Sequence, residues 1–255
     1  MEGFLYSSRL KQISKPPPGN RPLKTLERLL SKAGIGSRTE ARKWVAAGRL
    51  EVNGRVVRHP DTWVDLERDR IFFDGKPLRK QEPVYLLLYK PAGYLTTYDD
   101  PQGRPTIYDL LPDRDRYLFS VGRLDLDTSG LLILTNDTAF AERVTNPDFK
   151  VPKTYLVKAS KHLSDADLDR LRNGLELRDG PTRPAAVEQI RESGGKTVFE
   201  ITITEGRNRQ VRRMVEALDA KVLKLVRVAI GPIRIGDLEI GKARELTPSE
   251  LAALR

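Results

Sequence analysis

Two unbroken apolar runs constrain the fold of this 255-residue chain more than any other feature. Residues 84–89 read Val-Tyr-Leu-Leu-Leu-Tyr, and residues 130–134 read Gly-Leu-Leu-Ile-Leu. A half-exposed strand alternates apolar and polar side chains, whereas a strand covered on both faces is apolar throughout. Each run therefore predicts a strand buried on both faces. The chain is long enough for a small domain followed by a larger one that supplies this cover.

The larger domain, expected over residues 83–255, mixes strands and helices without a regular alternation. Further strand patterns are 153–160, 196–206, 221–230 and 233–241. Helix patterns follow the capping residue Asp137, span 164–174 and about 208–218, and begin at the capping box Thr247-Pro-Ser-Glu250. This order predicts an α+β fold with a largely antiparallel sheet.

A different pattern occupies residues 24–75. Apolar residues at 26, 29, 30 and 33 form one face of a helix that ends at Gly34. Ser37 and Glu40 have the spacing of a capping box for a second helix, and Asn53-Gly54 favours a hairpin turn. A helix–helix–hairpin module is therefore expected. Its basic side chains are Lys32, Arg38, Arg42, Lys43, Arg49 and Arg55.

Two polar segments flank this module. Residues 1–23 contain Pro-Pro-Pro-Gly and scattered basic residues, and we interpret them as a flexible basic arm. Residues 76–82 are charged and contain proline, which favours a linker to the larger domain.

Composition excludes several kinds of site. The chain has no cysteine, which rules out disulfides, thiolate nucleophiles and cysteine-ligated metals, and its two histidines are far apart. Familiar phosphate-loop motifs and a Ser-His-Asp setting are missing, and we expect no metal. The formal net charge of +10 suits a polyanionic partner. No apolar run is long enough to cross a bilayer and no secretion signal is recognisable, so we expect a cytoplasmic protein without a membrane partner.

The segment 121–137, Val-Gly-Arg-Leu-Asp-Leu-Asp-Thr-Ser-Gly followed by Leu-Leu-Ile-Leu-Thr-Asn-Asp, places charged groups directly before a buried strand. Asp125 and Asp127 are two apart, so in an extended segment they face the same side. A metal pair would need further ligands nearby, and the paired carboxylates of glycosidases usually come from separate elements. Both aspartates could also simply stabilise the turn at 128–130. The residues alone leave these alternatives open.

The same segment closely resembles the catalytic motif of RsuA-type pseudouridine synthases, which carry an N-terminal S4 RNA-binding domain. Residues 86–97, 153–158 and 205–214 resemble further motifs of this family in the same order, and residues 24–64 resemble the S4 domain. The resemblance covers nearly the whole chain beyond the arm. It implies isomerisation of specific uridines in ribosomal RNA, free or in an assembling subunit, without cofactor or metal.

The resemblance also implies roles for single residues. Asp125 matches the family's essential aspartate, which either attacks C1′ of the ribose or takes a proton at C2′, whereas Asp127 falls where the family varies and is assigned a structural role. Arg212 matches the basic partner of the aspartate, and Tyr155 matches the tyrosine that packs against the target base. Arg123 is expected to hold the RNA after the base has left its stack. In the S4 domain, the six basic residues are expected to contact RNA; a solvated structural surface is the alternative.

Helix geometry gives a separate prediction of where the side chains of Arg209, Arg212 and Arg213 point. Val211, Met214, Val215 and Leu218 form an apolar stripe, with Arg212 at its edge. Arg212 can therefore turn inward to a carboxylate, while Arg209 and Arg213 are expected to face solvent or RNA phosphate. Two other functions fit less well: an RNA-binding protein with a vestigial site, and a nucleoside or glycoside hydrolase. No self-pairing motif is evident, so a monomer is expected.

Overall fold

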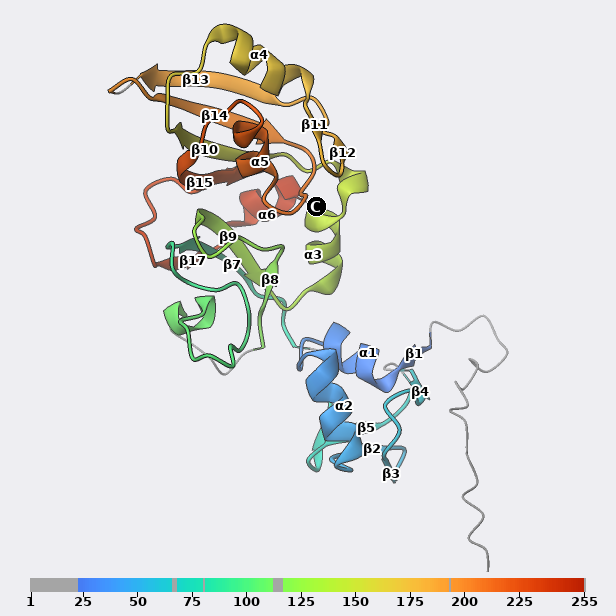
Figure 1. The fold of residues 1–255 in the computed structure, drawn as a ribbon. Coiled ribbons are helices and arrows are strands. Elements are labelled where there is room, and N and C mark those ends of the chain that lie inside the picture. Colours follow the sequence, from blue (N-terminus) through green and yellow to red (C-terminus); the bar gives the residue numbers. More distant parts are fainter. Residues whose placement is uncertain (1–22, 66–67, 80, 112–116, 193, 255) are drawn as a thin grey trace, which may run out of the picture. The chain divides into compact units, whose positions relative to one another are not determined.

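The computed structural model describes residues 23–65, 68–79, 81–111, 117–192 and 194–254 (Figure 1). The chain forms two compact units, Met1–Glu82 and Pro83–Arg255, and each is described here by itself. Except for Leu23, the arm expected over residues 1–23 lies outside the described residues. Within the described part, no helix has the length and apolar character needed to span a membrane.

The first unit begins with two helices and continues with short strands. Helices α1 and α2 cover Leu26–Lys32 and Arg38–Ala46. A four-stranded sheet has the order β3-β2-β5-β6, and β1 pairs with β4. The strands are β1 Lys24–Thr25, β2 Leu50–Val52, β3 Arg55–Val57, β4 Trp63–Val64, β5 Ile71–Phe73 and β6 Lys76–Pro77. The helix–helix–hairpin order is thus confirmed, with a core that both helices and the sheet share.

Local chemistry explains where these elements start and turn. The Ser37 hydroxyl accepts from the Glu40 amide at 3.1 Å, and the Glu40 carboxylate accepts from the Ser37 amide at 2.8 Å, which is the expected capping box. Asn53 and Gly54 both have positive φ, 52° and 78°, as the two-residue turn between β2 and β3 requires.

The start of the linker expected over residues 76–82 belongs to the first unit in the structure. Lys76–Pro77 form β6, which pairs antiparallel with β5, and Leu78 packs against the core of the first unit. The cause is a second hairpin turn at Asp74-Gly75, where both residues have positive φ, 49° and 74°. An Asp-Gly pair followed by Lys-Pro reads as a polar linker, although the chain turns back there and adds a strand.

The second unit contains a nine-stranded sheet. Its main path is β13-β14-β10-β15-β9-β7-β17, with β16 on β15 and β8 on β9. Among the described pairs, β9 and β15 run parallel and all others antiparallel, which confirms the largely antiparallel α+β fold. The strands are β7 Tyr85–Lys90, β8 Phe119–Val121, β9 Ser129–Thr135, β10 Lys153–Ala159, β13 Ala186–Glu192, β14 Thr197–Ile203, β15 Val222–Ile230, β16 Ile233–Arg234 and β17 Ala243–Glu245.

Alternate residues of β7 and β9 enter different cores. Leu87 and Ile133 belong to a cluster that includes residues of α3 and α6, while Leu88 and Leu132 belong to a cluster on the opposite face. The predicted burial of both faces is therefore confirmed. The helices are α3 Thr138–Thr145, α4 Asp165–Asn173, α5 Gln210–Glu216 and α6 Pro248–Leu254, with 3₁₀ turns η1 Ile107–Leu110 and η2 Pro147–Phe149; β11 Glu176–Leu177 and β12 Gly180–Pro181 form a small hairpin.

Two expected elements are shorter in the structure. The pattern 233–241 yields only β16, because the chain leaves the strand at Gly236, which has φ of 58°. The helix expected from about residue 208 starts at Gln210, because Arg209 adopts the left-handed conformation with φ of 47°. This second difference changes where the side chain of Arg209 points, as the site shows.

Candidate active site

The loop between β8 and β9 carries Asp125, and hydrogen bonds from Lys90 hold its backbone. This lysine ends β7 and is fully buried. Its Nζ donates to the backbone oxygens of Pro91 at 3.0 Å, Asp125 at 3.0 Å and Thr128 at 2.8 Å. Burial lowers the pKa of Lys90 to about 8, against the opposing influence of the Asp125 and Asp127 carboxylates. The apolar pattern before Lys90 points to a buried strand, but the role of its terminal lysine has no signal in that pattern.

Gly130 lets the start of β9 approach β15 closely. Its φ is 121°, and a Cβ at this position would lie 2.3 Å from the backbone oxygen of Arg227. Gly130 pairs with Arg227 in the parallel register of these two strands. Glycine at position 130 is therefore a packing requirement, and it fixes the end of the Asp125 loop against the middle of the sheet.

Two arginines lie beside the aspartates of the loop: Arg209 is near both Asp125 and Asp127, and Arg212 is near Asp127. Arg209 Nη1 lies 3.6 Å from Asp125 Oδ2, and the Arg209 guanidinium also donates two 3.2 Å hydrogen bonds to Asp127. Arg212 Nη2 lies 3.2 Å from Asp127 Oδ2. Partial burial alone would raise the pKa of Asp127, but the hydrogen bonds from Arg209 and the charges of both arginines outweigh it, so its pKa lies below the ordinary value.

The contacts of the three arginines differ from those expected from the sequence. Among the described residues, Arg212 forms no ion pair with Asp125; it donates instead to the backbone oxygen of Asp127 at 3.0 Å and to Thr128 Oγ1 at 3.3 Å. Arg212 does turn inward and is 7% exposed. Arg213 does not simply face solvent, because it forms an ion pair with Asp179 at 2.7 Å. Arg209 is the arginine that reaches Asp125.

A pocket of about 420 Å³ opens beside Asp125, a size within the usual range for small-molecule sites. Its lining includes Arg123, Asp125, Tyr155 and Arg209, so four of the residues singled out in the sequence share one cavity. The loop 204–210 forms another part of the wall. Arg123 is exposed, whereas the Asp125 side chain is 36% exposed.

Tyr155 lies on β10, opposite Arg227 of β15. Its ring is partly buried against two of the apolar clusters. Lys153 and Arg227 also line the pocket, and burial together with the Arg227 charge lowers the pKa of Lys153 to about 8. Sequence reasoning missed both cations. Arg227 interrupts an otherwise apolar strand pattern at 225–230, which is the signal that could have identified it.

The described residues contain no group of three or more His, Cys, Asp or Glu side chains arranged to hold a metal ion. Asp125 and Asp127 face arginines, so this carboxylate pair is arranged to meet cationic side chains.

Comparison with known proteins gives this geometry a family. The sequence profile described as RNA pseudouridylate synthase matches residues 84–217, and the S4 domain profile matches residues 25–71. An uncharacterized RNA pseudouridine synthase of Aquifex aeolicus (strain VF5) is 44% identical over 90% of this chain and 92% of its own length. The chain belongs to the RNA pseudouridine synthase family.

Two further comparisons support this membership. Ribosomal large subunit pseudouridine synthase B of Bacillus subtilis (strain 168) is 38% identical over 91% of this chain and 96% of its own length. A crystal structure of a pseudouridylate synthase superposes with a TM-score of 0.67 at 33% identity, covering 91% of this chain and 99% of that chain. This RNA pseudouridine synthase is therefore an isomerase with an S4 domain, as the sequence resemblance implies.

The basic residues of the S4 domain are not equivalent. Arg42 forms an ion pair with the buried carboxylate of Glu27. Arg49 donates to Asp74 at 2.9 Å and lies 4.7 Å from the ring centroid of Phe73. All six are exposed, and the structure shows no ion pair with an acidic group, among the residues it describes, for the other four: Lys32, Arg38, Lys43 and Arg55.

Proposed function

We propose that this synthase converts uridine to pseudouridine in ribosomal RNA of the large subunit, with Asp125 as the reacting carboxylate. The large-subunit assignment is supported by the name of the Bacillus subtilis relative, which aligns over nearly its whole length. The assignment of Asp125 as the reacting residue is supported by its position: it lines the pocket together with Tyr155, and Arg209 lies beside its carboxylate.

The reaction balances without a co-reactant. The N1–C1′ bond of uridine breaks, the uracil turns, and a C5–C1′ bond forms. The proton that leaves C5 goes to water, and N1 gains one, so composition and oxidation state are unchanged. An ionised Asp125 either attacks C1′ and is later displaced by C5, or removes the C2′ proton and later returns it.

Other side chains of the pocket support this step. Tyr155 presents its ring from β10 for contact with the base, as its position in the sheet allows. Arg123 is exposed at the same pocket and is suited to hold RNA from which the base has been flipped. Flipping costs a few kcal/mol, which stacking and cationic contacts can offset.

The S4 domain supplies affinity in this proposal. Its exposed cations Lys32, Arg38, Lys43 and Arg55 would contact phosphates, and such contacts release counterions. Because ribosomal RNA is the substrate, we place the protein in the cytoplasm, acting as a monomer on free RNA or an assembling subunit. Sedimentation of the protein alone tests the monomer.

The experiment is tritium release from RNA labelled at C5 of uridine. Formation of the C5–C1′ bond liberates this tritium to water, whereas a nucleoside hydrolase would release free uracil and a binding protein would release neither. We expect tritium release from large-subunit ribosomal RNA and none from small-subunit RNA. Release from the small-subunit RNA alone would overturn the substrate assignment, and release from neither would overturn the proposed activity.

A further inference from the structure

The loop that carries Arg209 is built around a buried carboxylate. Glu205 follows β14 and is 8% exposed, although acidic side chains are rarely buried unless they are paired. Glu205 also lines the pocket, as does the rest of the loop up to Gln210. The reaction proposed above does not use this carboxylate, so its burial needs another explanation.

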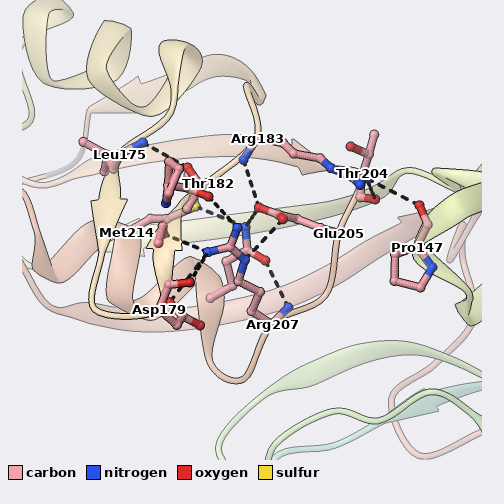
Figure 2. Close-up of polar contacts among 12 residues, drawn as sticks. Pro147, Leu175, Asp179, Thr182, Arg183, Thr204, Glu205, Arg207 and Met214 are labelled. Atoms are coloured by element: carbon pink, nitrogen blue, oxygen red, sulfur yellow. Dashed lines mark hydrogen bonds and ion pairs between the residues drawn. The ribbon is translucent and has the colours of Figure 1, made fainter.

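Three groups hold the Glu205 carboxylate. Its Oε1 accepts from the Arg183 amide at 3.0 Å and from Gln210 Nε2 at 2.6 Å, and Oε2 accepts from Arg207 Nε at 3.3 Å (Figure 2). Gln210 in turn accepts from the Arg207 amide at 3.1 Å. The Glu205 side chain therefore joins the two ends of the segment 205–210 to each other. It also joins this segment to the backbone at Arg183.

Arg207 extends this network away from the pocket. Its guanidinium donates to backbone oxygens of the β11–β12 hairpin: Asp179 at 3.3 Å, Gly180 at 2.8 Å, and Pro181. Figure 2 shows Arg207 between Glu205 and Asp179. The carboxylate of Asp179 also pairs with Arg213 of α5. The loop is thus fixed to the hairpin on one side and to the helix on the other.

Arg209 lies between Arg207 and Gln210 in this loop and does not itself contact Glu205 in the contacts described above. It has left-handed backbone geometry, with φ of 47°, and no side-chain cap holds the start of α5 there. Left-handed geometry is unfavourable for an arginine and persists where surrounding contacts impose it. The flanking contacts come from Arg207 and Gln210, both tied to Glu205. The conformation directs the guanidinium to Asp125 and Asp127.

We propose that Glu205 is a positioning residue, whose buried carboxylate holds the loop 205–209 in the conformation that presents Arg209 to Asp125. The inference rests on the proposed role of Asp125 in catalysis. Glu205 touches no reacting atom in this account. It sets the rate of isomerisation through Arg209 and has little influence on RNA affinity.

A double-mutant cycle in the full-length protein tests this. Glu205→Gln retains the shape and the oxygen that faces Arg183, but it places an amide N–H₂ opposite the Arg207 donor. Single-turnover rates on ribosomal RNA are measured for the parent, Glu205→Gln, Arg209→Ala and the double variant. Glu200→Gln is the matched control, since this glutamate lies on the preceding strand β14 and pairs with Arg234 at 3.0 Å. Thermal melting confirms that each variant is folded.

We expect each single variant to lower the maximal rate about tenfold, the effect of losing one charged hydrogen bond. Glu205→Gln should leave the half-saturating RNA concentration within about twofold and should lower the rate no further in the Arg209→Ala background. Glu200→Gln should match the parent. Should Glu205→Gln fail to fold, Gln210→Met breaks the same network and should show the same non-additivity.

Additive rate losses would overturn the proposal, because Glu205 would then act independently of Arg209. A rise in half-saturating RNA concentration at an unchanged maximal rate would also overturn it, as would a parental rate for Arg209→Ala. Failure of the proposed function is distinguishable: in that case the parent and Glu200→Gln themselves form no pseudouridine.

Discussion

Arg212 donates a 3.0 Å hydrogen bond to the backbone oxygen of Asp127. Arg212 is buried in α5, and this bond joins the helix to the turn that follows Asp125. Arg209, one turn earlier and half-exposed, reaches the carboxylates themselves. Arg212 therefore holds the backbone of the Asp125 loop and also pairs with the Asp127 carboxylate, whereas Arg209 is the arginine that also lies beside the Asp125 carboxylate.

Arg212→Ala should separate loop geometry from RNA binding. The variant loses charged hydrogen bonds to Asp127 and Thr128, so we expect the free energy of unfolding to fall by about 2 kcal/mol. The maximal rate should fall roughly 100-fold while RNA affinity stays near that of the parent. Urea denaturation and single-turnover kinetics measure both. An unchanged maximal rate would show that the position of the Asp127 backbone does not matter for Asp125.

Lys90 should make stability depend on pH. Its pKa of about 8 in the folded protein lies below the ordinary value of 10.5, so the unfolded chain binds this proton more tightly between these values. The free energy of unfolding should therefore rise with pH across this window. Relative to Lys90→Met, the parent should gain about 2 kcal/mol between pH 7 and 9.5. Parallel urea titrations that show no relative gain would contradict the lowered pKa.

Gly130→Ala should be much more damaging than an alanine at another glycine of positive φ. The added Cβ would lie 2.3 Å from the Arg227 backbone oxygen, and we expect a loss of about 3 kcal/mol or more. Gly180→Ala is the matched control, because its φ is 96° but nothing lies within 4 Å of the new Cβ. That variant should lose only about 1 to 2 kcal/mol. Equal losses in thermal or urea unfolding would mean that backbone strain, not the contact with β15, makes glycine necessary.

The S4 cations should fall into two groups. Arg38→Ala and Lys43→Ala remove exposed charges, so each should reduce the slope of log affinity against log salt by about 0.7–0.9 and leave the saturated rate unchanged. Arg42→Ala should instead lower the melting temperature of the S4 unit, since it leaves the Glu27 carboxylate buried without its partner. A lower saturated rate for Arg38→Ala at unchanged affinity would contradict this division.

The position of Asp125 in the fold could be predicted from the sequence, because a motif and a local rule agree there. Asp125 lies beside a pocket at the entrance to a fully buried strand, as the charged segment before an apolar run indicates. The direction of the Arg209 side chain could not be predicted from the sequence. A regular helix from residue 208 turns it away from Asp125, but one left-handed residue shortens the helix and directs the guanidinium inward. Contacts of Glu205 impose that conformation, and no periodic pattern in the sequence indicates them.

Two other failures have similarly local causes. The hairpin at Asp74-Gly75 is followed by one proline and three basic residues within 76–80, and this composition conceals the return of the chain. Strand β13 carries only a weak apolar signal, because it pairs only with β14 among the described strands and its residues are largely exposed. Backbone pairing at a sheet edge makes few demands on side chains, so composition gives little indication of it.

The most direct measurement compares the parent with Asp125→Asn on large-subunit ribosomal RNA, recording pseudouridine at every uridine together with RNA affinity. We expect the parent to modify one or a few specific uridines. In Asp125→Asn the rate should fall at least about 1,000-fold while affinity stays within about twofold, because only the reacting carboxylate has changed. Modification by Asp125→Asn at the parental rate would contradict the assignment of Asp125 as the reacting carboxylate.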